Sequence, residues 1–343
     1  MPDPRTSISA PESEPPLFAG IDLGGTNIKV GLVDNQGRSL AYISVPSQID
    51  AGPEEGTKRM GDAVRAAADQ AEVSINQIAR VGLATPGTMD IERGMLLDPV
   101  NLPGWHNFPI RDRVSEQTGR PVTYANDAAA AAFGEYWIGS GKQYQSMILL
   151  TLGTGIGGGI IIGDKSIDGE TSHGAECGHI IIDCGDDARL CSCRQPGHLE
   201  AYASATAVVA RTKEALAAGR RSRLSERVEG GESLTTLMLA DEAERGDELA
   251  LEIILETARY LGIGIVTLLH TIDPGAVLLG GAMTFGRHDN EIGRQFLAGV
   301  REEVRQRAFP VVVNHVTIDY ASLGGDAGYV GAAGLARIAH HHD

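Results

Sequence analysis

The chain has 343 residues, of which 42% are hydrophobic and 22% charged, values that are ordinary for a globular protein and sufficient for two domains. Its 29 basic and 45 acidic residues give a formal net charge of −16, and such a surface repels nucleic-acid phosphates and anionic lipid. These numbers weigh against nucleic-acid and membrane partners.

The N-terminal segment differs in composition from the rest. The first sixteen residues contain five prolines and lack the apolar run of a secretory signal. We therefore expect a disordered tail over residues 1–16. The four cysteines are unevenly spaced between residues 177 and 193. This usage is typical of a reducing compartment, so we expect a cytoplasmic protein without disulfides.

The first half of the chain alternates apolar strands with helices. A strand from residue 17 runs into the turn Asp-Leu-Gly-Gly-Thr-Asn at residues 22–27 and continues as a second apolar strand, residues 28–33. The expected elements that follow are a surface helix (54–72), a buried strand (80–84) with a turn (85–88), a loop (102–107), a helix (110–118), a strand (121–124) and a helix (128–137).

The second half repeats this scheme. Strand 147–150 runs into a glycine turn, residues 151–159, and strand 160–162 follows; the six glycines of residues 147–163 favour a buried hairpin over a membrane span. The later elements are a Cys/His segment (176–200), helices 201–217 and 242–269 with a charged loop (219–232) between them, strands 276–279 and 311–318, and a final helix (323–339) rich in Gly and Ala. Strands alternating with helices indicate an α/β fold.

The two glycine turns suggest phosphate binding. Glycine lets backbone N–H groups approach an anion closely, although a single glycine turn is more often only a hairpin. The first turn has neither the dinucleotide nor the Walker pattern. Two such hairpins facing each other would hold a polyphosphate from both sides, which indicates a kinase with two related halves. Asp22 lies at the end of the first strand, where its carboxylate can hold water ligands of Mg²⁺.

Asn126 and Asp127 lie where a strand gives way to a helix. A carboxylate at such a strand end can orient a substrate hydroxyl and take its proton during phosphoryl transfer. The alternative is structural, because Asn and Asp are preferred residues at helix N-termini.

Histidines and cysteines gather in the Cys/His segment. The pattern is Glu-Cys-Gly-His at 176–179, Cys-Ser-Cys at 191–193 and His-Leu-Glu at 198–200. Two histidines that bracket a Cys-x-Cys can surround a tetrahedral Zn²⁺, and we expect a structural zinc. The alternative is a set of idle thiols.

In combination, these motifs resemble the ROK family of sugar kinases, from about residue 17 to residue 339. The resemblance is carried by both glycine turns, by Asn126-Asp127-Ala128 with Gly134-Glu135, and by Glu176-x-x-His179 ahead of the Cys-x-Cys. It implies an actin/hexokinase-like α/β fold, in which a ribonuclease H-like domain is duplicated and the two domains close over sugar and ATP. We expect a smaller domain over 17–124 plus 323–339 and a larger one over 125–322, which carries the zinc knuckle.

The resemblance also implies roles for individual residues. Asp127 is the expected catalytic base on the 6-hydroxyl of a hexose. The residues expected to bind the sugar are Gly87, Asn126, Asp127, Glu176, His179 and Glu200. Those expected to bind ATP are Asp22, Gly25, Thr26, Asn27 and Lys29 on one side of the phosphates, Thr154 and Gly155 on the other, and Gly281 near the adenosine. The expected zinc ligands are His179, Cys191, Cys193 and His198.

One departure from the family pattern affects the metal site. The family reads Cys-x-Cys-Gly-x-x-Gly-Cys-x-Glu, whereas this chain has Arg194 at the first glycine and His198 at the third cysteine. Histidine is a competent zinc ligand, so we expect a Cys₂His₂ site, with Cys184 as a possible competitor.

The motif set is most similar to the bacterial glucokinases of this family, which implies a transferase of carbohydrate metabolism and glycolysis that uses ATP and Mg²⁺ and forms a homodimer. Glucose is the leading sugar; fructose, mannose, allose and N-acetylmannosamine stay open. The family also contains sugar-responsive repressors, but the first sixteen residues offer no helix-turn-helix. A silent sugar-binding module is disfavoured by Asp127 together with both turns. The acidic surface and the Cys/His segment favour ATP over polyphosphate.

Overall fold

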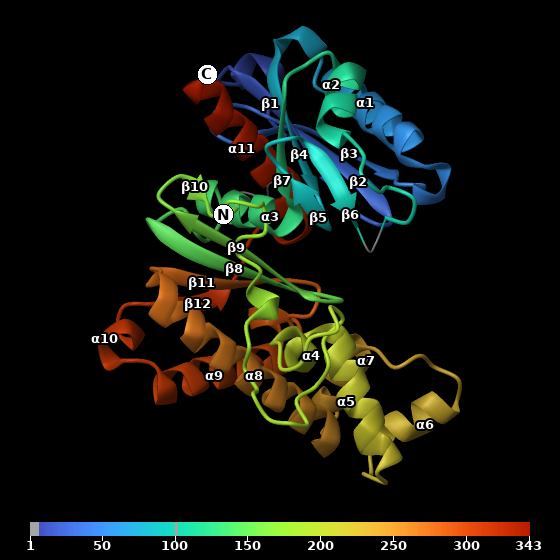
Figure 1. The fold of residues 1–343 in the computed structure, drawn as a ribbon, viewed down its shortest axis with the longest axis vertical. Coiled ribbons are helices and arrows are strands. Elements are labelled where there is room, and N and C mark those ends of the chain that lie inside the picture. The colour runs from blue at the N-terminus through green and yellow to red at the C-terminus, as the bar shows by residue number, and fades with distance from the viewer. Residues whose placement is uncertain (1–6, 100–101) are drawn as a thin grey trace. The chain divides into compact units, whose positions relative to one another are not determined.

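The computed structural model describes residues 7–99 and 102–343 of the chain. The chain forms two compact units, whose elements are labelled in Figure 1. Unit 1 consists of Met1–Gln145, Gly159–Ala175 and Ser322–Asp343, and unit 2 consists of Ser146–Gly158 and Glu176–Ala321.

Unit 1 is built on a five-stranded sheet with the order β3-β2-β1-β4-β7. β1 (Leu17–Leu23) pairs antiparallel with β2 (Asn27–Val33), which pairs antiparallel with β3 (Ser39–Pro46). On its other side β1 pairs parallel with β4 (Ile78–Thr85), and β4 pairs parallel with β7 (Val122–Asn126). β1, β4 and β7 therefore end at the same edge of the sheet. A separate two-stranded sheet joins β5 (Thr88–Asp90) to β6 (Met95–Asp98).

Helices cover both faces of this sheet. Side chains alternate between the faces along a strand, so the odd-numbered residues of β1 from Leu17 to Leu23 join the large core under α1 and α2. Phe18, on the opposite face, packs with Ala333 and Ala336 of the last helix. The four helices, visible around the sheet in Figure 1, are α1 (Pro53–Gln70), α2 (Ile110–Thr118), α3 (Asp127–Trp137) and α11 (Ala327–His342).

Glycines let α11 lie directly on the backbone of the sheet. A Cβ at Gly20 of β1 would lie 1.8 Å from the carbonyl oxygen of Tyr329, and a Cβ at Gly82 of β4 would lie 1.8 Å from that of Ala332. Any larger residue would overlap the helix backbone. The final helix rich in Gly and Ala that the sequence predicts is thus confirmed as α11.

The boundary between the units differs from the one expected. The sequence assigned residues from 125 onward to the second domain, whereas α3 belongs to unit 1. α3 and α11 cross so closely that a Cβ at Gly331 would lie 1.6 Å from the carbonyl oxygen of Ala130. The buried carboxylate of Glu135 also accepts a hydrogen bond from the backbone N–H of Leu323 at 2.6 Å. These contacts tie α3 to the C-terminal segment, which the strand pattern alone did not reveal.

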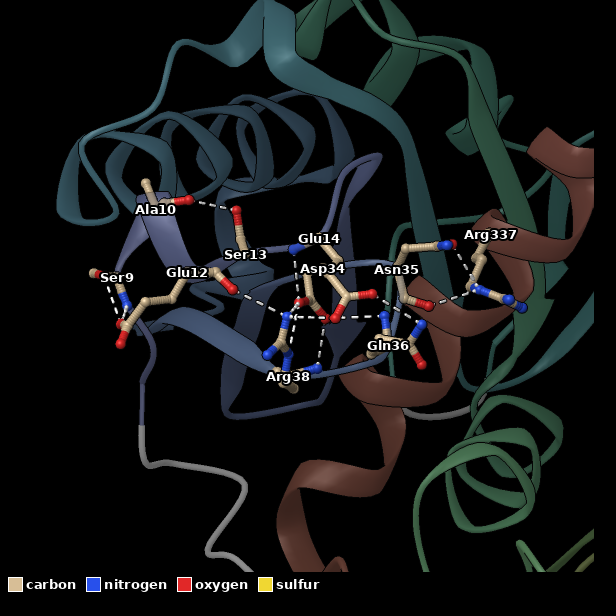
Figure 2. A network of polar contacts seen from close by, with 10 residues as sticks. All are labelled: Ser9, Ala10, Glu12, Ser13, Glu14, Asp34, Asn35, Gln36, Arg38 and Arg337. Atoms are coloured by element: carbon tan, nitrogen blue, oxygen red, sulfur yellow. Dashed lines mark hydrogen bonds and ion pairs between the residues drawn. The ribbon is translucent and has the colours of Figure 1, made fainter.

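The described part of the N-terminal segment, residues 7–16, is not the expected disordered tail; residues 1–6 lie outside the described residues. Its backbone is tied to β3 through Ile8 N–H, which donates to Ser39 O at 2.8 Å. Arg38 pairs with Glu14 at 3.3 Å and with Asp34 at 2.6 Å (Figure 2). Asp34 is fully buried and also accepts from Glu14 N–H, at 3.1 Å. A buried carboxylate requires such partners, so the segment is held by ionic and backbone contacts that a Pro-rich composition conceals.

Unit 2 contains three parallel strands covered by helices. β11 (Ala276–Gly281) pairs with β8 (Ser146–Leu152) on one side and with β12 (Thr317–Tyr320) on the other. The full order of this sheet is β10-β9-β8-β11-β12. Its outer hairpin is β9 (Ile156–Ile162) with β10 (Lys165–Ser166), of which the residues from Gly159 onward are assigned to unit 1. The helices are α4 (Glu200–Ala203), α5 (Ala205–Ala217), α6 (Arg223–Glu229), α7 (Thr236–Glu244), α8 (Glu248–Ile272), α9 (Glu291–Arg307) and α10 (Pro310–Val313).

Several expected elements of unit 2 are divided. The helix expected over 201–217 is interrupted at Ser204, whose hydroxyl accepts from Ala207 N–H and begins α5. The helix expected over 242–269 becomes α7 and α8, which Gly246 separates with a φ of 83°. The segment 219–232, expected as a loop, contains α6, and the strand expected over 311–318 begins only at residue 317 because Pro310 starts α10.

The two glycine hairpins have the same dimensions. β1 and β2 are seven residues each and are separated by residues 24–26; β8 and β9 are seven residues each and are separated by residues 153–155. In the first turn Gly24 N–H donates to Asn27 O at 2.9 Å, and in the second Gly153 N–H donates to Gly155 O at 3.0 Å. The repetition that the sequence predicts is confirmed for these hairpins.

Candidate active site

The carboxyl ends of the parallel strands in unit 1 gather polar residues. Asp22 of β1 lies opposite Ala84 of β4 in the strand register, and Thr85 of β4 lies opposite Asn126 of β7. Asp127 follows as the first residue of α3. Ligands of α/β proteins bind at this edge of a sheet. The strand register thus brings Asp22, Asn126 and Asp127 to one edge of the sheet, as expected for residues of a ligand-binding site.

Asn126 and Asp127 both act at the N-terminus of α3. The side-chain oxygen of Asn126 accepts from Ala128 N–H at 2.9 Å and from Ala129 N–H at 3.2 Å, so the structural interpretation of this residue is confirmed. Its amide nitrogen is the group that can donate to a ligand. Asp127 Oδ1 accepts from Ala128 N–H at 2.8 Å. The helix dipole favours an ionised carboxylate at this position.

A buried tyrosine lies behind this pair. Tyr124 of β7 is 3% exposed, and its hydroxyl is 2.8 Å from Thr85 Oγ1. Burial raises the pKa of Tyr124, the hydrogen bond with Thr85 opposes the rise, and the negative charge of Asp127 adds to it. The phenol therefore stays neutral and contributes no negative charge to the edge of the sheet.

The first glycine turn is exposed at its tip and held from behind. Gly25, Thr26 and Asn27 are exposed, whereas the buried Ser47 donates its hydroxyl to Gly24 O at 2.6 Å. The turn thus presents backbone and small side chains to solvent from a fixed position.

Asp22 and Lys29 are directly opposite each other on β1 and β2. Burial raises the pKa of the Asp22 carboxyl, and the positive charge of Lys29 offsets part of this shift. A partly buried carboxylate without full hydration favours a cation partner, which fits a role beside Mg²⁺. Lys29 Nζ also donates to Gly325 O at 2.7 Å, which connects the first hairpin to the segment that leads into α11.

Gly87 lies in the turn after β4 and is exposed. Its φ is 93°, and a Cβ there would lie 2.6 Å from Cα of Pro99. Only glycine fits this backbone position, whatever ligand the turn contacts.

The second glycine turn, in unit 2, is held by helix α5 and by a carboxylate. Thr206 donates its hydroxyl to Thr154 O at 2.8 Å, and Ala205 N–H donates to Gly153 O at 2.9 Å. On the other side, Ile156 N–H donates to Glu200 Oε2 at 2.9 Å. Thr154 is exposed at the tip.

Gly281 ends β11 beside the second turn, opposite Leu152 in the register. Its φ is 86°, and a Cβ there would lie 2.3 Å from Leu152 O. The glycine is therefore required by the close approach of the two strands, and its exposed position leaves space over the strand end.

His179, Cys191, Cys193 and His198 form one cluster, in which one ligand atom of each lies within 4.8 Å of all the others. Nδ1 of His179 is 3.2 Å from Nδ1 of His198 and 3.7 Å from Sγ of Cys191, and Sγ of Cys193 is 3.2 Å from Nδ1 of His198. A tetrahedral zinc with Zn–N near 2.0 Å and Zn–S near 2.3 Å separates its ligand atoms by about 3.3 to 3.8 Å. The cluster fits zinc, with His198 in the expected place.

The remaining cysteines lie outside this cluster. Cys184 is exposed and is absent from every metal-like group among the described residues, so it does not compete with His198. Burial raises the pKa of the Cys177 thiol to about 12, which keeps it protonated and unreactive.

Glu176 and Glu200 flank the cluster on two sides. Nε2 of His179, the nitrogen that faces away from the other ligands, is 3.9 Å from Glu176 Oε2. Glu200 Oε1 accepts from Ser192 Oγ at 2.6 Å. The structure therefore brings Glu176, His179 and Glu200 together within unit 2.

Arg194 explains why a glycine is usual at its position. Its φ is 69°, in the left-handed region that side chains with a Cβ rarely adopt. The conformation closes the turn between the cysteines and the second histidine, in which Arg194 N–H donates to Cys191 O at 2.9 Å. This chain therefore forms the same turn with an arginine, whose backbone is strained where a glycine would not be.

Several supporting residues gave no signal in the sequence. Ser47 and Thr206 hold the two turns through single hydroxyls, far from them along the chain. Tyr202 donates its hydroxyl to Asp183 Oδ2 at 2.6 Å and accepts from Arg189 N–H at 2.7 Å, which fixes the base of the Cys/His segment. Such contacts depend on tertiary structure and leave no pattern in the sequence. Ser192, which donates to Glu200, is the exception because it lies within the Cys-Ser-Cys motif.

The chain matches the ROK family over residues 18–339. It is 31% identical over 318 residues to the glucokinase of Thermotoga maritima, an alignment that covers 93% of this chain and 96% of that protein. It resembles the crystal structure of a ROK family glucokinase from Streptomyces griseus in complex with glucose and AMPPNP, with 34% identity, a TM-score of 0.74 and coverage of 94% of this chain and 99% of that one. The predicted two-domain actin/hexokinase-like α/β fold is confirmed.

A relative of another class is also similar. The xylose repressor of Caldicellulosiruptor bescii is 30% identical over 304 residues, which cover 89% of this chain and 74% of that protein. Among the described residues, no helix combines the length and apolar character that crossing a membrane requires.

Replacing Arg194 by glycine should raise the free energy of unfolding by about 0.5–1 kcal/mol, because glycine adopts a positive φ without strain. Urea denaturation of the purified protein measures this. The matched control is Arg194→Ala, which removes the same side chain and keeps the strain. An R194G protein no more stable than R194A would show that the turn is unstrained.

Proposed function

The chain belongs to the ROK family, and on that basis we propose that it is a glucokinase, which transfers the terminal phosphoryl group of ATP to the 6-hydroxyl of glucose. The observation that carries this proposal is the similarity, over nearly the full length, to a glucokinase solved with glucose and an ATP analogue. The pair of equal hairpins and the carboxylate at the start of α3 supply the chemistry that such a transfer requires.

Asp127 acts as the general base in this proposal. Its carboxylate takes the proton of the sugar 6-hydroxyl while the hydroxyl oxygen bonds to the terminal phosphorus of ATP. The bond between that phosphorus and the bridging oxygen breaks, and ADP leaves. Phosphoryl transfer has a loose transition state, so a weak base that orients the hydroxyl is sufficient.

The other sugar hydroxyls need buried donors and acceptors. We assign these to the Asn126 amide, Glu176, the free nitrogen of His179 and Glu200, with Gly87 providing the space that a side chain would fill. Carboxylates and imidazole that lose hydration on binding favour a ligand whose hydroxyls replace the lost water.

The two glycine turns bind the phosphates of ATP. Gly25, Thr26, Asn27 and Lys29 belong to one turn and its following strand, and Thr154 and Gly155 belong to the other. Gly281 leaves room for the adenosine. Both tips are exposed and both are held from behind, as a backbone anion site requires.

Two metals complete the proposal. Asp22, whose burial favours a cation partner, would hold the Mg²⁺ of the nucleotide, which neutralises phosphate charge. His179, Cys191, Cys193 and His198 would hold a structural zinc. Because Nδ1 of His179 faces the cluster and Nε2 faces away, the metal would fix the tautomer and aim Nε2 at a sugar hydroxyl.

The function is tested by measuring ADP release from ATP and Mg²⁺ with glucose, fructose, mannose, allose and N-acetylmannosamine. We expect the largest kcat/KM with glucose. Inorganic polyphosphate in place of ATP serves as the donor control and should support little transfer. Failure to consume ATP with any of these sugars would refute the kinase proposal, and a larger kcat/KM for another sugar would refute glucose.

Asp127→Asn should lower kcat about 10²- to 10⁴-fold and change the glucose KM much less, because asparagine fits the site but takes no proton. Steady-state kinetics of the purified variant measure both constants. The control is Asp50→Asn, an exposed aspartate in a short turn of unit 1. Turnover within a few-fold of the unmodified protein would place the base elsewhere.

Cys193→Ser should lose zinc and raise the glucose KM, because His179 loses the partner that orients it. Metal analysis should find one zinc per chain in the unmodified protein. Cys184→Ser is the matched control, since both thiols are exposed and only Cys193 belongs to the cluster. His198→Cys should keep its zinc. An unmodified protein far below one zinc per chain, or equal losses in C193S and C184S, would contradict the assignment.

A further inference from the structure

Glu200 connects two parts of unit 2 that are separate in sequence. Its Oε1 accepts from Ser192 Oγ at 2.6 Å and lies 3.5 Å from Cys191 Sγ, both within the Cys/His segment. Its Oε2 accepts from Ile156 N–H at 2.9 Å, directly after the second glycine turn. Each carboxylate oxygen therefore serves one of the two parts.

We propose that Ser192 and Glu200 form a bridge through which the Cys/His segment positions the second glycine turn, so that Ser192 is a positioning residue for nucleotide binding. The inference rests on the proposed function, because it takes that turn to bind the phosphates of ATP. Ser192 itself touches neither the sugar nor the nucleotide in this proposal.

The turn is closely fitted to the carboxylate. A Cβ at Gly155 would lie 2.3 Å from Glu200 Oε2, so the backbone of the turn rests against this oxygen. Hydrogen bonds to a charged carboxylate are stronger than those between neutral groups. A change in the direction of the Glu200 side chain would therefore move the Gly155–Ile156 peptide, whose neighbouring N–H groups are the ones available to a phosphate.

The rest of unit 2 holds the opposite side of the turn and the base of the Cys/His segment independently. Thr206 and Ala205 of α5 bond to Thr154 O and Gly153 O. Tyr202 fixes Asp183 and Arg189 at the base of the segment. Loss of the Ser192 hydroxyl therefore leaves Glu200 Oε1 only its longer contact with Cys191 Sγ, at 3.5 Å, and releases neither the segment nor the far side of the turn.

The test compares Ser192→Ala with Ser192→Thr. Residue 192 is exposed, so threonine keeps the hydroxyl and has room for its methyl group. We expect S192A to weaken the binding of AMPPNP, measured by calorimetry, roughly threefold to tenfold, and S192T to bind nearly as the unmodified protein does. The zinc content should stay near that of the unmodified protein, and the glucose KM should rise as well, because Glu200 is also assigned to the sugar. Equal AMPPNP affinity in S192A and the unmodified protein would overturn the inference.

Amide hydrogen exchange gives a readout that does not depend on catalysis. The segment 153–157 should exchange faster in S192A than in S192T. If S192A also loses zinc, the Glu200→Gln variant tests the bridge instead. Residue 200 is not one of the four proposed zinc ligands, and glutamine offers a single acceptor oxygen to the two donors, Ser192 Oγ and Ile156 N–H. Unchanged exchange of 153–157 in E200Q would overturn the bridge. A chain that shows the expected exchange but phosphorylates no sugar would refute the proposed function and leave the bridge standing.

Discussion

The proposed function depends on two short turns whose backbone N–H groups would bind the phosphates. Each is three residues long, follows a seven-residue strand and precedes another. Backbone N–H groups can bind an anion only if no side chain covers them and the turn does not move. The first condition explains the glycines. The second explains the hydroxyls of Ser47 and Thr206, each of which donates to a turn carbonyl from within its own unit.

The strand register of the unit 1 sheet determines where the proposed catalytic and metal-binding carboxylates lie. Parallel pairing places the ends of β1, β4 and β7 at one edge, and with them Asp22 and Asp127. That arrangement relies on α11, which lies against β1 and β4 at distances that only Gly20 and Gly82 permit. α3 crosses α11 with equal closeness, and Asp127 is the first residue of α3. The position of the proposed base is therefore set by backbone contacts at the other end of the chain.

The sequence predicts the functional motifs well, but it does not predict the tertiary contacts that hold them in place. The hairpins, the cap at Asn126 and the four metal-like residues were found because each depends on neighbouring residues or on a known spacing. The order of residues in α3 does not show that it packs on α11, so the domain boundary was misplaced. The proline-rich start suggested disorder because the charges of Asp34 and Arg38 that hold it lie in another segment. The helix break at Ser204 lies within an alanine-rich run, and the break at Gly246 lies within a charged segment, so neither interrupts the helical composition around it.

The central claim is that both turns hold one nucleotide while Asp127 directs a glucose hydroxyl at its terminal phosphate. A crystal structure of this chain with glucose and AMPPNP tests it most directly. We expect backbone N–H groups of both turns within hydrogen-bond distance of phosphate oxygens, and the Asp127 carboxylate within the same distance of the 6-hydroxyl. Phosphates remote from either turn, or a 6-hydroxyl that contacts another side chain in place of Asp127, would contradict the account.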